Sequence, residues 1–75
     1  MAIQTDPTAT HEYLADGAGR ARTFSYCTIA FLVAEQNAPQ LRAAGWFPYL
    51  VHAAPSDWRI ALARSEAEAV RRNEF

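Results

Sequence analysis

The chain has 75 residues, of which 51 % are hydrophobic and 20 % charged, and its formal net charge is −1. A chain this short forms a single small domain, which buries only about 60 % of the surface that its unfolded form exposes. The near-neutral charge gives no general attraction to nucleic-acid phosphates. The uncharged run at residues 23–34 is shorter than the ~20 residues that span a bilayer, so we expect no membrane partner.

The single cysteine, Cys27, excludes an intramolecular disulfide. Small domains without disulfides usually need a metal or a partner chain for additional stability. No secretory signal is visible, because the N-terminus lacks a basic region followed by an apolar run. We therefore expect a cytoplasmic protein.

Residues 1–10 show little periodicity and predict an extended or frayed lead-in that could still pair as an edge strand. His11 to Ala15 reads as a short strand. It is followed by a turn, because Asp16 to Gly19 holds two glycines and an Asp-Gly step. The chain from Arg22 onward should return antiparallel. An anion-binding loop is the alternative for the same glycines and the arginines behind them.

Thr23 to Val33 is the most apolar run and is rich in aromatic and β-branched residues, so its composition predicts a central strand. A helix is the alternative, because several apolar residues in this run also recur at three-to-four spacing. Asn37 and Gln40 form a capping box that predicts a short helix from Ala38 to Ala44, and Gly45 supplies its stop.

Residues 46–64 predict a β-hairpin. Trp58, Ile60 and Leu62 alternate with smaller or charged residues, as in a strand with one buried side. Pro55 favours a turn from Ala54 to Asp57.

A second capping box, Ser65 with Glu68, predicts a helix from Glu66 to about Asn73. These elements predict a small α+β domain over residues 1–75. Its antiparallel sheet has three to four strands and carries two short helices in a ββαββα-like order. The predicted core comprises Phe24, Ile29, Phe31, Leu32, Leu50, Trp58, Ile60 and Leu62.

Side chains capable of nucleophilic or metal chemistry are few. Cys27 with His11 or His52 would support a small enzyme or a metal protein, but no metal-binding spacing such as C-x-x-C or H-E-x-x-H is present. We therefore expect neither enzymatic activity nor a cofactor, and keep the Cys-His set as an alternative.

The aromatic strand at residues 46–51 is bulky on both faces, and a domain this small can cover only one of them well. Pro48 lacks a donor, which fits an edge strand. We therefore expect a non-enzymatic protein-protein interaction module that binds a protein partner or forms a homodimer. Its size and lack of catalytic groups suggest a phage- or bacterium-encoded inhibitor of the anti-CRISPR kind that binds a host protein complex. The predicted partner-binding residues are Trp46, Phe47, Tyr49, Val51 and Arg59.

A nucleic-acid-binding protein is a further alternative, because arginines and aromatic rings can contact phosphates and stack on bases. Clustering of the arginines on one face would favour it, and glutamates among them would count against it. The arginines concerned are Arg20, Arg22, Arg59, Arg64, Arg71 and Arg72.

Overall fold

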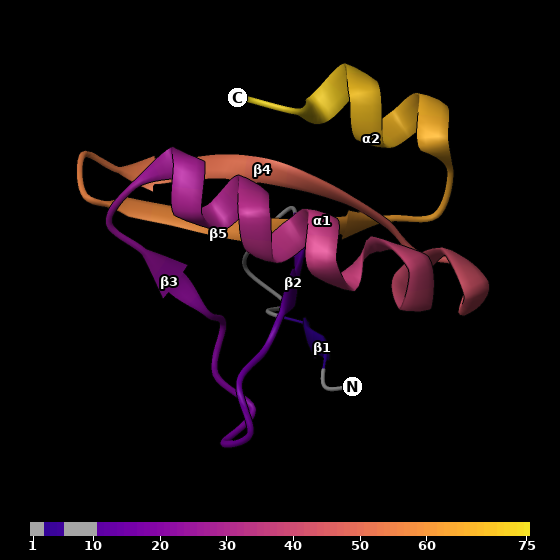
Figure 1. Ribbon diagram of the computed structural model, residues 1–75, viewed down its shortest axis with the longest axis horizontal. Helices are drawn as coiled ribbons and strands as arrows, with labels where there is room; N and C mark the ends of the chain where they lie inside the picture. Colours follow the sequence, from indigo (N-terminus) through magenta and orange to yellow (C-terminus); the bar gives the residue numbers. More distant parts are fainter. Residues whose placement is uncertain (1–2, 6–10) are drawn as a thin grey trace.

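The computed structural model describes residues 3–5 and 11–75. These residues form an antiparallel sheet and two helices, which confirms the predicted α+β class and its ββαββα-like order (Figure 1). The elements in chain order are β1 (Ile3–Thr5), β2 (Glu12–Leu14), β3 (Thr23–Phe24), α1 (Cys27–Ala43), β4 (Phe47–Ala54), β5 (Asp57–Ala63) and α2 (Glu66–Arg72).

Strand β5 is the centre of the sheet. β4 pairs along one side of it, and β2 and β3 lie end to end along the other. β1 pairs with the outer side of β2, so the sheet is four strands wide. The predicted strand at residues 11–15 is confirmed as β2. The expectation for residues 1–10 lies outside the described residues except at Ile3–Thr5.

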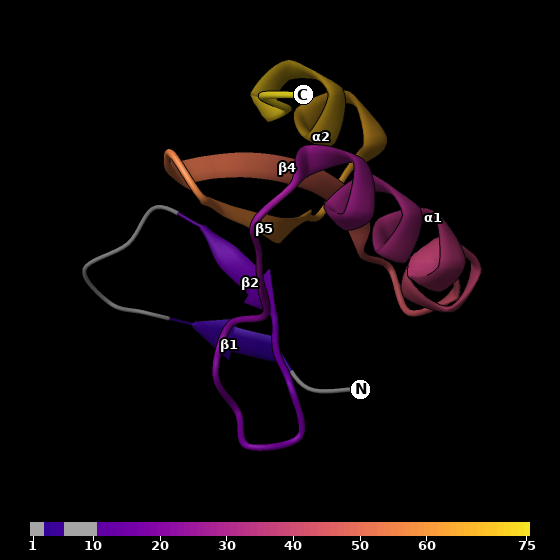
Figure 2. The ribbon, with the colours of Figure 1, turned by 60° about the vertical axis from the view of Figure 1, so that its left-hand side comes forward.

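Residues 15–22 leave the line of the sheet between β2 and β3 and form a loop that projects away from β4 (Figures 1 and 2). The Asp16 carboxylate accepts the backbone N–H groups of Ala18 and Arg20 at 2.8 and 3.1 Å, and Gly19 has a φ of 80°. The N–H of Arg22 then donates to the carbonyl of Leu14 at 3.0 Å, which brings the chain back to the sheet. The predicted turn is therefore present.

The predicted strand from Thr23 to Val33 is wrong beyond Phe24, because helix α1 begins at Cys27. Ala30, Ala34 and Ala38 recur every fourth residue and are buried, so small side chains let the helix lie close to the sheet. Three bulky residues suggested a strand and a place in the core, but they lie outside this buried stripe. Their exposed fractions are 48 % for Ile29, 44 % for Phe31 and 55 % for Leu32.

The predicted helix from Ala38 to Ala44 is the last part of α1, so Asn37 is not its N-cap. Instead, the Asn37 side-chain amide donates to the carbonyl of Val33 inside the helix. The predicted stop is confirmed: Gly45 has a φ of 86°, its N–H donates to Arg42, and the N–H of Trp46 donates to Leu41. These two bonds form a Schellman motif, which satisfies carbonyls that the helix end would leave unpaired.

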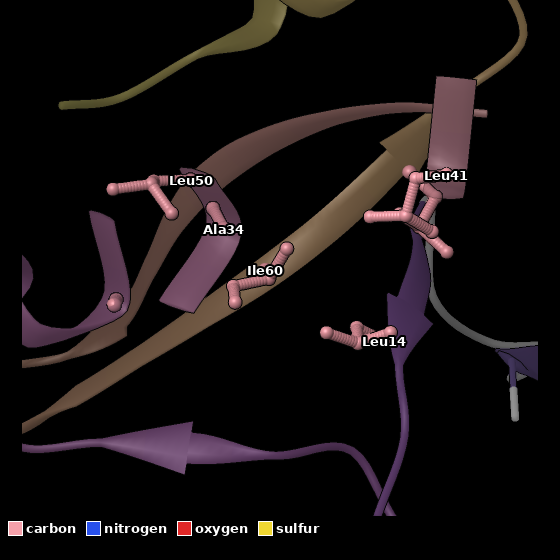
Figure 3. Close-up of a cluster of buried hydrophobic side chains, with 7 residues drawn as sticks. Leu14, Ala34, Leu41, Leu50 and Ile60 are labelled. Carbon is pink, nitrogen blue, oxygen red and sulfur yellow. The ribbon is translucent and has the colours of Figure 1, made fainter. Parts of the chain in front are cut away.

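The hairpin at residues 46–64 is confirmed as β4 and β5, with a register shift between His52 and Ala54. Its alternating pattern places Ile60 and Leu62 in one buried cluster with residues of α1. Leu14 of β2 and Leu50 of β4 belong to the same cluster, and Figure 3 shows both around Ile60. Leu50, Ile60 and Leu62 are buried as predicted, while Phe24 and Trp58 are partly buried against this cluster.

Helix α2 covers the opposite face of the sheet. Its Ala69 is buried with Tyr13, Tyr49 and Val51. The predicted capping by Ser65 is confirmed, because its hydroxyl oxygen accepts the N–H of Glu68 at 3.2 Å. The helices thus lie on different faces of the sheet, with β4 between them.

Candidate protein-binding groove

A groove with a volume of about 440 Å³ runs along β4 between α1 and α2. This volume lies within the range of about 300–1,000 Å³ that is usual for ligand sites. Apolar side chains from all three elements form most of its wall, and charged side chains from both helices stand among them. It is lined by Phe31, Ala34, Glu35, Arg42, Phe47, Pro48, Tyr49, Leu50, Glu66, Ala69, Val70, Asn73 and Phe75.

The groove follows the outer edge of β4. Within the described residues β4 pairs with β5 alone, so its other edge has no strand neighbour. Leu50 and His52 direct their N–H groups to this edge, and in an antiparallel pair Pro48 occupies an equivalent position. Pro48 has no N–H to leave unpaired there, which confirms the predicted edge strand.

Residues 73–75 cap this edge without forming a strand. The side-chain carbonyl of Asn73 accepts the N–H of Leu50 at 2.9 Å, and the N–H of Glu74 donates to the Leu50 carbonyl at 2.9 Å. The Glu74 carboxylate accepts the N–H of His52, also at 2.9 Å. Two side-chain oxygens and one backbone N–H thus satisfy backbone groups that a neighbouring strand would otherwise pair.

Aromatic rings continue this contact toward α1. The ring of Phe75 lies edge-on to Phe31 at 5.3 Å and to Trp58 at 6.4 Å between centroids. Trp58 in turn stacks on His52 at 4.3 Å with the rings nearly parallel. Phe75 is 52 % exposed, so it rests on this cluster without being enclosed by it.

A polar cluster lies on the face of the sheet that α2 covers. The Nδ1 atom of His11 is 2.7 Å from the Tyr49 hydroxyl and 3.1 Å from a guanidinium nitrogen of Arg72. Because a guanidinium can only donate, His11 accepts this bond as a neutral ring. Burial lowers the pKa of His11, and the charge of Arg72 adds to this effect. Burial also raises the pKa of Tyr49. The cluster connects the residue before β2 with β4 and α2.

The predicted partner-binding residues do not form one exposed surface. Tyr49 and Val51 are buried, while Trp46, Phe47 and Arg59 are half-buried. Phe47 and Tyr49 line the groove. Trp46 instead packs under Arg64, whose guanidinium carbon is 3.7 Å from the ring centroid. The binding role of the five residues stays a prediction.

Arg59 lies on the face opposite α1. Its guanidinium donates to both carboxylate oxygens of Asp57, at 3.2 and 3.0 Å, and the guanidinium carbon lies 5.2 Å from the Tyr13 ring centroid. The hydrogen bonds to Asp57 raise the pKa of Arg59. These contacts direct its charge toward neighbours in the same chain.

Sequence reasoning missed Phe31, Val70 and Phe75 as groove residues. Phe31 was assigned to the core on the expectation of a strand. The four-residue spacing of the alanines in α1 is the signal that could have placed it outside the core. Phe75 has no such local signal, because its position depends on contacts with Phe31 and Trp58.

The three residues of the predicted Cys-His set have separate surroundings. Cys27 is the first residue of α1, His11 belongs to the polar cluster beneath α2, and His52 stacks on Trp58. Among residues 3–5 and 11–75, no three His, Cys, Asp or Glu side chains gather as a metal site would require.

The fold and the groove together define a small α+β protein with an interhelical groove along a strand edge. Comparisons with family models, with curated proteins and with solved structures give no significant match. Neither helix in the described part of the chain is long and apolar enough to cross a membrane.

Proposed function

We propose that this chain is a non-enzymatic protein-interaction module that receives a protein partner in the groove between α1 and α2. One observation carries the proposal: exposed apolar side chains converge on this groove from both helices. Phe31 is 44 % exposed, Val70 73 % and Phe75 52 %. Apolar side chains gathered at a concave surface favour association, because a partner would remove them from water.

The charges of the chain favour a protein partner over nucleic acid. Arg59 and Arg72 form ion pairs with Asp57 and Glu68, each at 3.0 Å. An arginine paired in this way has less charge available for a phosphate. Glutamates also lie among the arginines of α2, and this arrangement counts against the nucleic-acid alternative.

The narrower expectation of a cytoplasmic inhibitor belongs to the same proposal. The free thiol of Cys27, which suits a reducing compartment, supports the cytoplasmic part of this expectation. Identifying the partner would test this narrower expectation.

The experiment compares exposed apolar residues inside and outside the groove. The immobilised chain is incubated with bacterial lysate, and retained proteins are quantified by mass spectrometry. Val70→Ser and Phe75→Ser should reduce retention of a specific partner by about thirtyfold, the effect of losing roughly 2 kcal/mol at a binding hot spot. The matched controls are Tyr26→Ser and Leu32→Ser, at residues that are 71 % and 55 % exposed but do not line the groove.

Retention that is equal for groove and control variants would contradict the proposal. So would a parent chain that retains no protein and stays monomeric at high concentration. Cooperative thermal unfolding of each variant shows that its fold is intact.

A further inference from the structure

Residues 73–75 occupy the edge of β4 as an added strand would, but with fewer backbone bonds. Asn73 and Glu74 together make three hydrogen bonds to Leu50 and His52, and Phe75 adds ring contacts with Phe31 and Trp58. Residues 73–75 of the chain are therefore themselves a peptide segment that fits the edge of β4.

The unit formed by α2 and residues 73–75 is held more lightly than the β4–β5 hairpin. Ala69 is the one residue of α2 that is buried, and residues 73–75 are all exposed. The unit joins β5 through Arg64 and Ser65, which are exposed as well. Segments with few buried apolar contacts open at a lower free-energy cost than the core.

We propose that two copies of this chain exchange this unit, so that residues 65–75 of one copy form the α2 wall of the groove and cap the β4 edge of the other. A second copy is the occupant that the contacts support, because an identical segment re-forms every bond seen within one chain. Exchange of an identical element is a low-cost route to dimers. The inference rests on the proposed function of the groove as an interaction surface.

The protein concentration determines whether the unit stays in its own chain, as in the closed monomer, or is shared in the exchanged dimer. Within one chain the segment competes at an effective concentration in the millimolar range, as expected for a short connection. Exchange therefore becomes measurable when the protein is refolded at a similar concentration. Because exchange and its reversal both require α2 to detach, exchanged dimers should return to monomers after dilution.

The test pairs two single-cysteine chains that both carry Cys27→Ser. One has His52→Cys and the other Glu74→Cys, positions that the structure places side by side across the β4 edge. The two chains are refolded together at about 1 mM and then oxidised. The expected product is a covalent dimer with a 52-to-74 linkage, identified by mass spectrometry. The control replaces Glu74→Cys with Gly17→Cys, which lies in the open loop between β2 and β3.

A yield of the 52-to-74 linkage no higher than that of the control pair would overturn the exchange. The unmodified chain gives a second measurement that does not depend on the cysteine variants. Light scattering after refolding at the same concentration should detect a dimer, and a purely monomeric chain would also overturn the proposal. Failure of the exchange leaves the proposed function standing if Val70→Ser still reduces partner retention while Tyr26→Ser does not.

Discussion

The imidazole of His11 shows how one side chain can couple distant parts of a small fold. It contacts Tyr49, a buried residue of β4, and Arg72, in the last turn of α2. Arg72 also pairs with Glu68 within the helix. The acceptor role of His11 requires the ring to be neutral, so protonation would set two cations against each other.

This arrangement predicts that the protein loses stability in mild acid. The folded pKa of His11 lies below the ordinary histidine value of 6.5, so the unfolded chain binds the proton more readily. The free energy of unfolding should therefore be highest above pH 6.5 and fall as the pH drops through that value. Denaturant unfolding at a series of pH values measures the effect.

The control for this prediction is His11→Gln, which keeps a neutral polar side chain at the position. The variant should show a flatter dependence of unfolding free energy on pH. An equally steep dependence in the variant would assign the effect to other groups.

The elements differ in how far their sequence could reveal them. The hairpin of β4 and β5 was predictable, because its alternation and its Pro55 turn are local signals. Helix α1 was not, since Ile29 and Phe31 are of strand-favouring types and the deciding stripe consists of alanines. For a run that is apolar on every side, which residues become buried depends on tertiary packing, and composition does not reveal it.

A pair of isoleucine substitutions tests this assignment directly. Ile60, in β5, is fully buried beneath α1, whereas Ile29, in α1, is 48 % exposed. Ile60→Ala should cost about 2–5 kcal/mol of unfolding free energy, and Ile29→Ala should cost less than about 1 kcal/mol. Chemical denaturation of both variants measures the difference. Equal losses would mean that Ile29 is buried and that α1 is assigned wrongly.

At the scale of the whole molecule, the groove and the capped edge depend on contacts between elements that are far apart in the sequence. Pro48 identified β4 as an edge strand from sequence alone. The sequence could not show that α1 and α2 would border that edge, or that Asn73 and Glu74 would cap it, because these contacts join residues more than twenty positions apart. The sequence therefore predicted strand β4 of the groove, but it did not predict the two helices that form the walls.

Removing the cap should change how the molecules behave toward one another. Asn73→Ala with Glu74→Pro removes the acceptor for Leu50, the carboxylate for His52 and the N–H that donates to the Leu50 carbonyl. An uncapped strand edge favours pairing between chains. We expect more aggregation on heating, measured by light scattering, while Arg71→Ala, at an exposed position of α2, should behave like the parent. No increase in scattering would show that the cap does not protect the edge.

The loop between β2 and β3 is a suitable site for inserting a label into this protein. Its base is closed where Arg22 bonds to Leu14, so the paired strands on either side do not depend on what lies between. Doubling the length of a flexible loop costs only about 0.6 kcal/mol. The loop also projects from the side of the sheet away from α2 (Figures 1 and 2). An epitope tag or fluorophore spliced in after Gly17 would therefore report on events at the groove without standing in it.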